Sequence, residues 1–219
     1  PRPVSSAASD VYKRQVADPR RTRTAAKSDH YVSLRPGSDV AFIWGILWHV
    51  FGNQWEDKEF IRQRVFGMEE IREEVAKWNP AEVERVTGVS EEDVYQTAKL
   101  LSENRPGCIV WCMGGTQHTT GNNNTRAYCV LELALGNIGK SGGGANIFRG
   151  HDNVQGATDL GVLSDTLPGY YGLSEGSWRH WSKVWEIDFD WVKGRFDDNA
   201  YGGQKPMNSA GTVSYTHLT

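Results

Sequence analysis

The stretch that decides the fold is residues 108–161, which read CIVWCMGGTQHTTGNNNTRAYCVLELALGNIGKSGGGANIFRGHDNVQGATDLG. An apolar run leads into a glycine pair and a polar loop, and an apolar helix then leads into a second glycine-rich loop. This order predicts a strand, a loop, a helix and a loop, a unit that lays backbone N–H groups and a helix N-terminus against a phosphate or another anionic ligand. We therefore expect this segment to hold a large phosphate-bearing cofactor and to supply the arginine, Arg149, that faces the substrate.

The pattern around this stretch predicts an α/β fold. Residues 108–113 are apolar at every position, as expected of a parallel strand covered by helices on both faces. Val16 and Ala17 read as the end of another strand, and residues 30–35 alternate like a third. Helices are predicted at residues 40–50, 58–66, 68–78, from residue 80, 91–103 and 125–135. Those between residues 58 and 103 are expected to cover the sheet.

Helix caps can be proposed from the polar residues that precede these segments. Ser38 or Asp39 could cap the helix at 40–50, and Ser90 begins a capping box before residue 91. The amides at 122–124 could cap the last helix, and Gly136 would end it.

The composition shows no electrostatic sign of two classes of partner. The 219 residues are 38% hydrophobic and 23% charged, with a net charge of -3. This near-neutral balance gives no electrostatic case for nucleic acid or for an anionic membrane surface. The longest apolar run, residues 40–51, is broken by Gly45 and His49 and falls short of the length that spans a bilayer.

The three cysteines, Cys108, Cys112 and Cys129, include no CxxC pair, so they predict neither a zinc site nor a disulfide framework. We expect them to be small buried hydrophobic residues, and we predict no metal ligand in this chain. The tryptophans at positions 178, 181, 185 and 191 are expected to serve packing rather than base stacking.

The sequence lacks the motifs GxGxxG, GxxxxGK[ST] and HExxH, and its strongest candidate site is RGHDNVQG at residues 149–156. Arginine binds a carboxylate or another oxyanion through two parallel hydrogen bonds. His151 could transfer protons near neutral pH, and the amides of Asn153 and Gln155 could satisfy the edge of a heterocycle. The residues alone leave open whether this cluster is functional or is a tight polar turn with one salt bridge. The same alternatives stay open for Gln117.

Three runs, MGGTQHTTG, LALGNIGKSGGGAN and FRGHDNVQGATDLGVLSDTLPGYY, resemble the catalytic alpha subunit of formate dehydrogenases, within the molybdopterin oxidoreductase (dimethyl sulfoxide reductase-like) family. VADPR and LRPGSD stand upstream in the matching order, and the resemblance covers residues 16–191. It implies a Rossmann-like parallel sheet with flanking helices, as part of a multi-domain fold. It also implies oxidation of formate to carbon dioxide at bis-(molybdopterin guanine dinucleotide), which carries molybdenum or tungsten.

The resemblance assigns roles to individual residues. The residues that it places at the cofactor are Asp18, Pro36, Gly37, Asp39, Met113, Gly114, Thr116, Gln117, Asn153 and Gln155. Those from 18 to 39 would line a guanine-nucleotide site, and those from 113 to 117 would approach the pterin. Arg149 would face the metal and orient the formate carboxylate, and His151 would tune the site or relay protons. On local pattern alone, Asp18 could instead be a turn residue and Asp39 a helix cap.

The ends of the chain do not share this resemblance. Residues 1–15 and 213–219 resemble translated adaptor sequence, and we set both aside as non-native tails. The family's cysteine motif for a 4Fe–4S cluster, its metal-ligating Cys or selenocysteine and its C-terminal domain have no counterpart in these residues. The chain is therefore expected to be an internal fragment of a parent protein, inactive alone and a poor binder of the cofactor.

The expected organisation is a Rossmann-like cofactor-binding region at residues 16–150 and the start of an adjoining domain, with the active-site loop, at 151–212. The parent enzyme would pass electrons to an iron–sulfur subunit and, in a membrane complex, to a cytochrome subunit. A periplasmic, membrane-associated location is expected, with a cytoplasmic one as the alternative. Two other functions stay open: a nitrate or polysulfur reductase of the same family, and a non-catalytic nucleotide-binding module.

Overall fold

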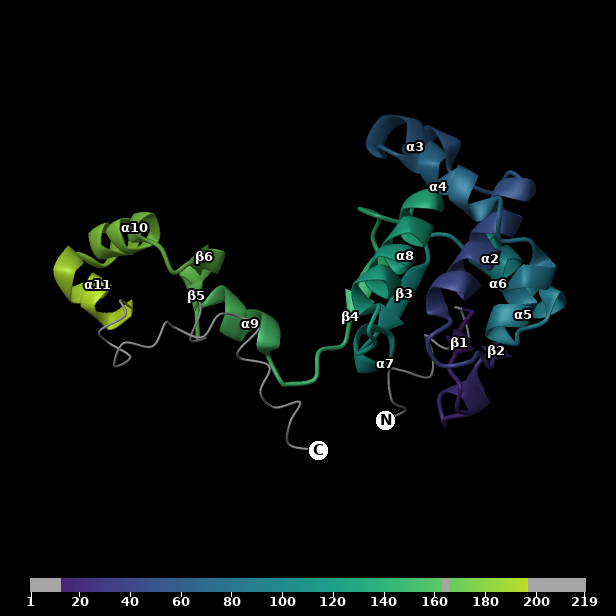
Figure 1. The fold of residues 1–219 in the computed structure, drawn as a ribbon, viewed down its shortest axis with the longest axis horizontal. Helices are drawn as coiled ribbons and strands as arrows, with labels where there is room; N and C mark the ends of the chain where they lie inside the picture. The colour runs from purple at the N-terminus through teal and green to yellow at the C-terminus, as the bar shows by residue number, and fades with distance from the viewer. Residues whose placement is uncertain (1–12, 163–165, 197–219) are drawn as a thin grey trace, which may run out of the picture. The chain divides into compact units, whose positions relative to one another are not determined.

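The computed structural model describes residues 13–162 and 166–196 of the chain (Figure 1). The chain divides into two units, Pro1–Phe148 and Arg149–Thr219. The tail predicted at residues 213–219 and the first twelve residues of the N-terminal one lie outside the described residues. In the described ranges, no helix combines the length and the apolarity needed to cross a membrane.

The first strand pair of unit 1 joins β1 (Gln15–Ala17) and β2 (His30–Val32) in parallel, with η1 (Ala25–Lys27) between them. Gln15 lies opposite His30, so the pair includes the last residue of the stretch set aside as a tail. The predicted strand at residues 30–35 is shorter than expected and ends at Val32. The reason is that the backbone N–H of Arg35 donates to the carbonyl of Thr87 rather than to a neighbouring strand.

The second strand pair joins β3 (Cys108–Trp111) and β4 (Gly144–Ile147), also in parallel, and Cys108 lies opposite Gly144. Between them the chain forms α7 (Met113–Thr116) and α8 (Gly121–Ala134). This strand–helix–strand crossover and the parallel pairing confirm the predicted α/β fold. The sequence did not predict β4, because its first residue belongs to a glycine run that we read as irregular. The prediction that helices cover both faces of β3 is also wrong, since Cys108 and Val110 are exposed.

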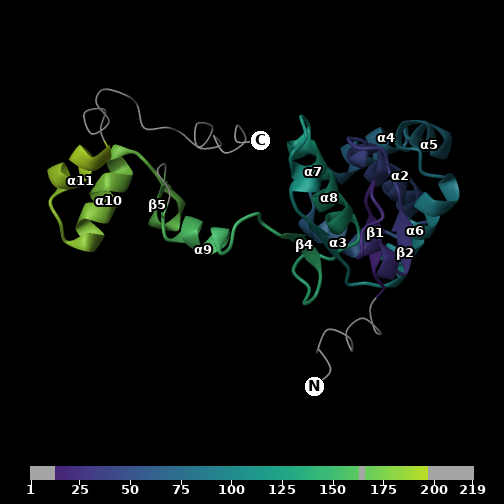
Figure 2. The same cartoon turned by 90° about the horizontal axis from the view of Figure 1, so that it is seen from below.

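The core of unit 1 is built around one helix, α2 (Asp39–Gly52). Its side chains are apolar on almost every side, so it can be stable only if other elements surround it. Helices α4 (Met68–Val75), α5 (Pro80–Thr87), α6 (Glu91–Glu103) and α8 do so (Figure 2), while α3 (Lys58–Arg64) packs on α8. The expectation that the helices between residues 58 and 103 cover a sheet is therefore wrong: α4, α5 and α6 cover α2.

The predicted caps have mixed outcomes. The Ser90 hydroxyl accepts a hydrogen bond from the backbone N–H of Asp93 at 3.2 Å, which confirms that cap. Ser38 does not cap α2, since its hydroxyl donates to the carbonyl of Arg35 at 2.6 Å. Asp39 does not cap α2 either, and Asn124 lies inside α8 rather than before it. Gly136 ends the α8 segment with φ 66°, as predicted.

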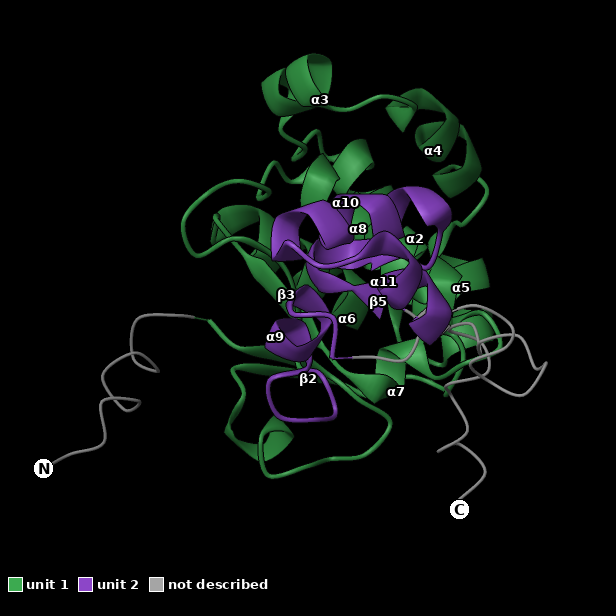
Figure 3. Cartoon of the chain, turned by 90° about the vertical axis from the view of Figure 1, so that its left-hand side faces the viewer, with its two compact units in different colours: residues 1–148 green, residues 149–219 purple. Residues whose placement is uncertain are grey.

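Unit 2 contains short elements (Figure 3). They are α9 (Val154–Asp159), β5 (Thr166–Leu167), η2 (Pro168–Tyr170), β6 (Tyr171–Gly172), α10 (Glu175–Trp185) and α11 (Phe189–Phe196). The antiparallel strands β5 and β6 form a hairpin, and α10 packs on α11. The tryptophans show the expected packing only in part: Trp181 stacks at a tilt on Trp185, with 4.9 Å between ring centroids, but Trp191 is 56% exposed.

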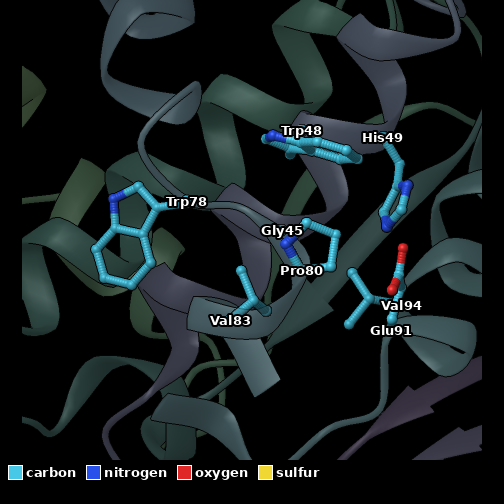
Figure 4. A pocket seen from close by; sticks show the side chains of 8 residues that line it. All are labelled: Gly45, Trp48, His49, Trp78, Pro80, Val83, Glu91 and Val94. Atoms are coloured by element: carbon cyan, nitrogen blue, oxygen red, sulfur yellow. The ribbon is translucent and has the colours of Figure 1, made fainter. Parts of the chain in front are cut away.

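Helices α2, α5 and α6 leave a narrow hollow between them (Figure 4). Its lining is mostly apolar, and burial lowers the pKa of His49 while the nearby Glu91 carboxylate opposes that shift. None of the residues that the sequence predicted for a site lies in this lining. The lining consists of Gly45, Trp48, His49, Trp78, Pro80, Val83, Glu91 and Val94. We interpret the hollow as part of the packing around α2.

Replacement of Gly45 by alanine should destabilise unit 1. A Cβ atom at this position would lie 2.7 Å from Cγ1 of Val83 on α5 and 3.2 Å from Cγ1 of Val94 on α6, and both of these side chains are buried. Overpacking of this kind costs about 1–3 kcal/mol. Urea unfolding of Gly45→Ala should show this loss. The control is Gly52→Ala in the same helix, where a Cβ would meet no atom within 4 Å and stability should hold or rise by up to ~1 kcal/mol. Equal stability of the two variants would contradict the packing described for α2.

Candidate functional site

The segment between β3 and α8 exposes backbone and polar side chains at the surface of unit 1. Met113, Gly114, Thr116 and Gln117, all predicted cofactor residues, are exposed along α7 and its end. A Cβ atom at Gly114 would meet no atom within 4 Å, so a bound molecule could approach the backbone closely there. The prediction of a loop here is wrong in detail, because residues 113–116 form one helical turn.

The start of α8 fixes the shape of this segment. The amide of Asn124, 1% exposed, donates to the carbonyl of Gly115 at 2.9 Å. His118 donates through Nε2 to the carbonyl of Gly114 at 2.8 Å. A Cβ atom at Gly121 would lie 1.9 Å from the carbonyl oxygen of Thr116, so only glycine lets the helix begin so close to the loop. The sequence did not predict this role for Asn124, because we interpreted residues 122–124 as helix caps. The only local signal was that Asn124 is the asparagine nearest to the apolar part of the helix.

The turn before α2 meets the same segment through Tyr128. Asp39 is partly exposed and follows the exposed turn of Pro36 and Gly37, in which Gly37 has φ 84°. The Tyr128 hydroxyl donates to Oδ1 of Asp39 at 2.8 Å. A Cβ atom at Gly115 would lie 2.7 Å from the same hydroxyl oxygen. Tyr128 therefore joins two segments that the sequence predicted separately.

Asp18 occupies the turn after β1. Its carboxylate Oδ1 accepts from the backbone N–H of Arg20 at 2.7 Å, and its carbonyl accepts from the Tyr31 hydroxyl at 2.9 Å. These contacts suit a turn aspartate at the carboxyl edge of a parallel strand, the edge at which open α/β sheets bind ligands.

The remaining predicted residues lie in unit 2. Arg149 and His151 are exposed on the loop that precedes α9. Asn153 has φ 54° and stands before the first residue of α9, and its side chain lies against Gly156. The structure thus groups Arg149, His151, Asn153 and Gln155 in one unit and the other predicted residues in the other unit.

A polar cluster that the sequence did not predict surrounds Gln155. Its amide donates to Oδ1 of Asp159 at 2.9 Å and to the Tyr170 hydroxyl, which donates to the same carboxylate. The hydrogen bond to Asp159 is the main cause that raises the pKa of Tyr170, and the positive charge of Arg149 opposes it. The sequence did not predict this cluster, because the partners of a tyrosine are not visible in a local pattern.

One buried carboxyl group lies between α8 and the second strand pair. Glu132 is 1% exposed, and burial raises its pKa to about 7, although hydrogen bonding to Asn137, Ile109 and Gly144 pulls in the opposite direction. Asn137, which is fully buried, accepts from the backbone N–H of Gly107 at 3.1 Å. This group lies beneath the strands that lead into the segment of Met113 and the loop of Arg149. In the sequence, the only indication of this buried carboxyl group was a charged residue within an apolar predicted helix.

The exposed residues of unit 1 from Met113 to Gln117 fit a polar heterocyclic cofactor. Exposed hydroxyl and amide groups surround open glycine backbone, and these supply both donors and acceptors. In the described part of the chain no three His, Cys, Asp or Glu side chains gather as a metal site. The expectation that the cysteines are buried is wrong for Cys108, which is exposed, while Cys112 and Cys129 are half-buried.

Comparison with known proteins identifies similar sequences across most of the chain. The family model described as molybdopterin oxidoreductase matches residues 5–185. The alpha subunit of F420-dependent formate dehydrogenase from Methanocaldococcus jannaschii is 38% identical over 175 residues, which cover 80% of this chain and 26% of that protein. Formate dehydrogenase H from Escherichia coli is 36% identical over 174 residues, 79% of this chain and 24% of that protein. The chain thus spans about a quarter of the length of these relatives.

A solved structure shares the fold. Acetylene hydratase from Pelobacter acetylenicus superposes with a TM-score of 0.59 and is 28% identical, over 62% of this chain and 19% of that chain. The similarity agrees with the mixed helix and parallel-strand architecture described above.

The buried Glu132 should make stability depend on pH. Its pKa rises from 4.5 in the unfolded chain to about 7 in the fold, so the folded state holds the proton more tightly. The contribution of Glu132 to stability is then greatest below pH 4.5 and falls as the pH rises through 7, by roughly 3 kcal/mol in all. Urea unfolding between pH 5 and pH 8 should show this fall in the wild-type chain and not in Glu132→Gln. An exposed carboxylate replaced on α5, Glu84→Gln, is the control and should keep the wild-type slope. An unchanged slope in Glu132→Gln would exclude Glu132 as its source.

Proposed function

Because this chain belongs to the molybdopterin oxidoreductase family, we propose that it forms part of the catalytic subunit of a formate dehydrogenase and serves the oxidation of formate to carbon dioxide. Family membership implies a molybdopterin cofactor with molybdenum or tungsten. The observation that carries the choice of formate is the identity of 36–38% to two formate dehydrogenases over about four fifths of the chain.

We assign cofactor binding to unit 1. The exposed backbone and side chains from Met113 to Gln117 are placed to hold the pterin, and Asp39 with the Pro36–Gly37 turn suits a guanine ring. Asp18 at the carboxyl edge of β1 would complete the nucleotide site. The finer identity of the cofactor, bis-(molybdopterin guanine dinucleotide), rests on the resemblance of these motifs. When bound, this group supplies a two-electron redox centre.

We assign substrate binding to the loop of unit 2. Formate is a small anion, and its oxidation removes one proton and two electrons to leave carbon dioxide. The exposed guanidinium of Arg149 can bind the formate carboxylate through two parallel hydrogen bonds. His151, also exposed, can accept the released proton near neutral pH. Asn153 and Gln155 would support the cofactor from the same loop and the start of α9.

The partners and the location of the enzyme are part of the proposal. A 4Fe–4S cluster and an iron–sulfur subunit would carry the electrons away, with a cytochrome subunit in a membrane-associated periplasmic complex. A cytoplasmic enzyme is the alternative location. These points are supported by the resemblance of the RGHDNVQG segment.

A second candidate is another reaction of the same family, and the similarity to acetylene hydratase favours keeping it. One fold can carry several chemistries, so the same architecture is compatible with a different substrate. A nitrate or polysulfur reductase belongs to the same group of alternatives.

A chimeric enzyme tests the substrate. The segment of Escherichia coli formate dehydrogenase H that matches this chain is replaced by the chain's own residues, and the protein is produced with cofactor-loading machinery. We expect bound molybdenum and formate-dependent reduction of a viologen dye, because the chain should supply the same binding groups as the segment that it replaces. Nitrate reduction and acetylene hydration are assayed in parallel, with the unmodified enzyme as control. Metal binding with either of those activities, and none with formate, would contradict the proposal.

Replacement of Arg149 tests the substrate-binding role in the same chimera. Arg149→Ala should lower formate turnover about 100-fold or more, because it removes a fixed charge and two donors, while the molybdenum content stays unchanged. Arg149→Lys keeps the charge but loses the planar fork, so its activity should be intermediate. Lys183→Ala, an exposed cation on α10, is the matched control and should leave turnover unchanged. Equal losses of metal and turnover in Arg149→Ala would instead indicate a structural role.

A further inference from the structure

Tyr128 on α8 connects the two parts of unit 1 to which we assign cofactor binding. Its side chain is 8% exposed, and its ring packs on Trp111 at the end of β3, with 5.1 Å between the ring centroids. Its hydroxyl group reaches the Asp39 carboxylate at 2.8 Å, across 89 residues of sequence. The same hydroxyl lies against Gly115, where a Cβ atom would be only 2.7 Å away. One side chain therefore supports both the turn before α2 and the loop after β3.

The Asp39 carboxylate is placed for recognition rather than for capping. It stands at the first residue of α2, is only partly buried, and does not accept from the amides of its own helix. Among the described residues, its hydrogen-bond partner is Tyr128. A carboxylate has about four lone-pair sites, so one bond to Oδ1 fixes the group and leaves Oδ2 and part of Oδ1 to accept from a ligand.

We propose that Tyr128 is a positioning residue, which holds the Asp39 carboxylate in the orientation that accepts two N–H donors from a guanine ring while its aromatic ring supports the loop at Gly115. This inference rests on the proposed function, because it assigns a role to Tyr128 at the nucleotide end of that cofactor. It extends the proposal by naming the group that sets the base preference.

The chemistry of the two purines explains why the orientation matters. Guanine presents two neighbouring N–H donors on one edge, and a carboxylate can accept both. Adenine presents one donor beside a ring nitrogen that is itself an acceptor, and this lone pair would face the second carboxylate oxygen. A carboxylate that is fixed in one orientation enforces this difference, whereas a freely rotating one enforces it less.

The environment of Tyr128 keeps its hydroxyl a donor. Burial first, and then the hydrogen bond and the negative charge of Asp39, raise the pKa of Tyr128 far above its usual value. The proton therefore stays on the tyrosine throughout the physiological range, and the hydrogen bond to Asp39 keeps the same direction.

Nucleotide binding to the full 219-residue chain tests this role. Calorimetric titrations with GDP and with ADP, up to millimolar concentrations, compare the wild type with Tyr128→Phe, which removes only the hydroxyl oxygen. We expect the wild type to prefer GDP, and Tyr128→Phe to bind GDP about tenfold more weakly with ADP affinity unchanged. Asp39→Asn should abolish the preference, and adding Tyr128→Phe to it should cause no further loss, because the two groups act as a unit.

Three results would overturn the role of Tyr128. They are an equal loss of GDP and ADP affinity in Tyr128→Phe, the same loss in the Asp39→Asn background, and a wild-type chain without preference for GDP. Thermal melting of each variant separates a loss of affinity from a loss of folding. If the chimera oxidises formate while Tyr128→Phe leaves the GDP preference intact, this inference fails and the proposed function stands. If the chimera does not oxidise formate but the GDP preference depends on Tyr128, the proposed reaction fails alone.

Discussion

The burial of α2 on nearly all sides is the constraint on which the rest of unit 1 depends. Its sequence, DVAFIWGILWHVFG, offers no polar face to water, so its free energy is favourable only when other helices surround it. Four helices meet this need, and at Gly45 two of them approach so closely that a methyl group does not fit. The turn before α2 is thereby fixed in place, and the Asp39 carboxylate with it.

Helix α8 contacts both this packed core and the candidate site. Leu131 and Ala134 belong to the buried core, while Asn124 and Tyr128 on the same helix hold the segment after β3 through polar contacts. An α-helix is rigid over these few turns. A shift of α8 in the core would therefore also move the polar side chains that hold the segment after β3. Glu132 connects the same helix to the strands themselves, through hydrogen bonding to Ile109 of β3 and Gly144 of β4.

The sequence predicted what depends on local pattern, and it failed where distant partners decide. The strand at Cys108 and the helix that follows it, the cap at Ser90 and the helix end at Gly136 follow from periodicity and turn chemistry, and the structure confirms them. Strand β4 was not predicted, because its first residue belongs to a glycine run and glycine does not favour strands. Pairing with β3 stabilises the strand nevertheless. The roles of Asn124, Tyr128 and Glu132 were not predicted either, because a periodic pattern shows which face is buried, not which group lies opposite. The roles of Arg149 and His151 came from the motif and stay predictions.

The contact between Asp39 and Tyr128 also has a consequence for the order in which the chain folds. These residues are 89 positions apart, so their hydrogen bond closes a long loop and can form only after α2 and α8 have docked. Contacts of such sequence separation form slowly compared with helices and tight turns. The contact between the turn at Asp39 and α8 is thus a late product of folding, and partial opening between α2 and α8 would break it while the individual helices persist. A cofactor bound at that place would stabilise the completed fold rather than nucleate its formation.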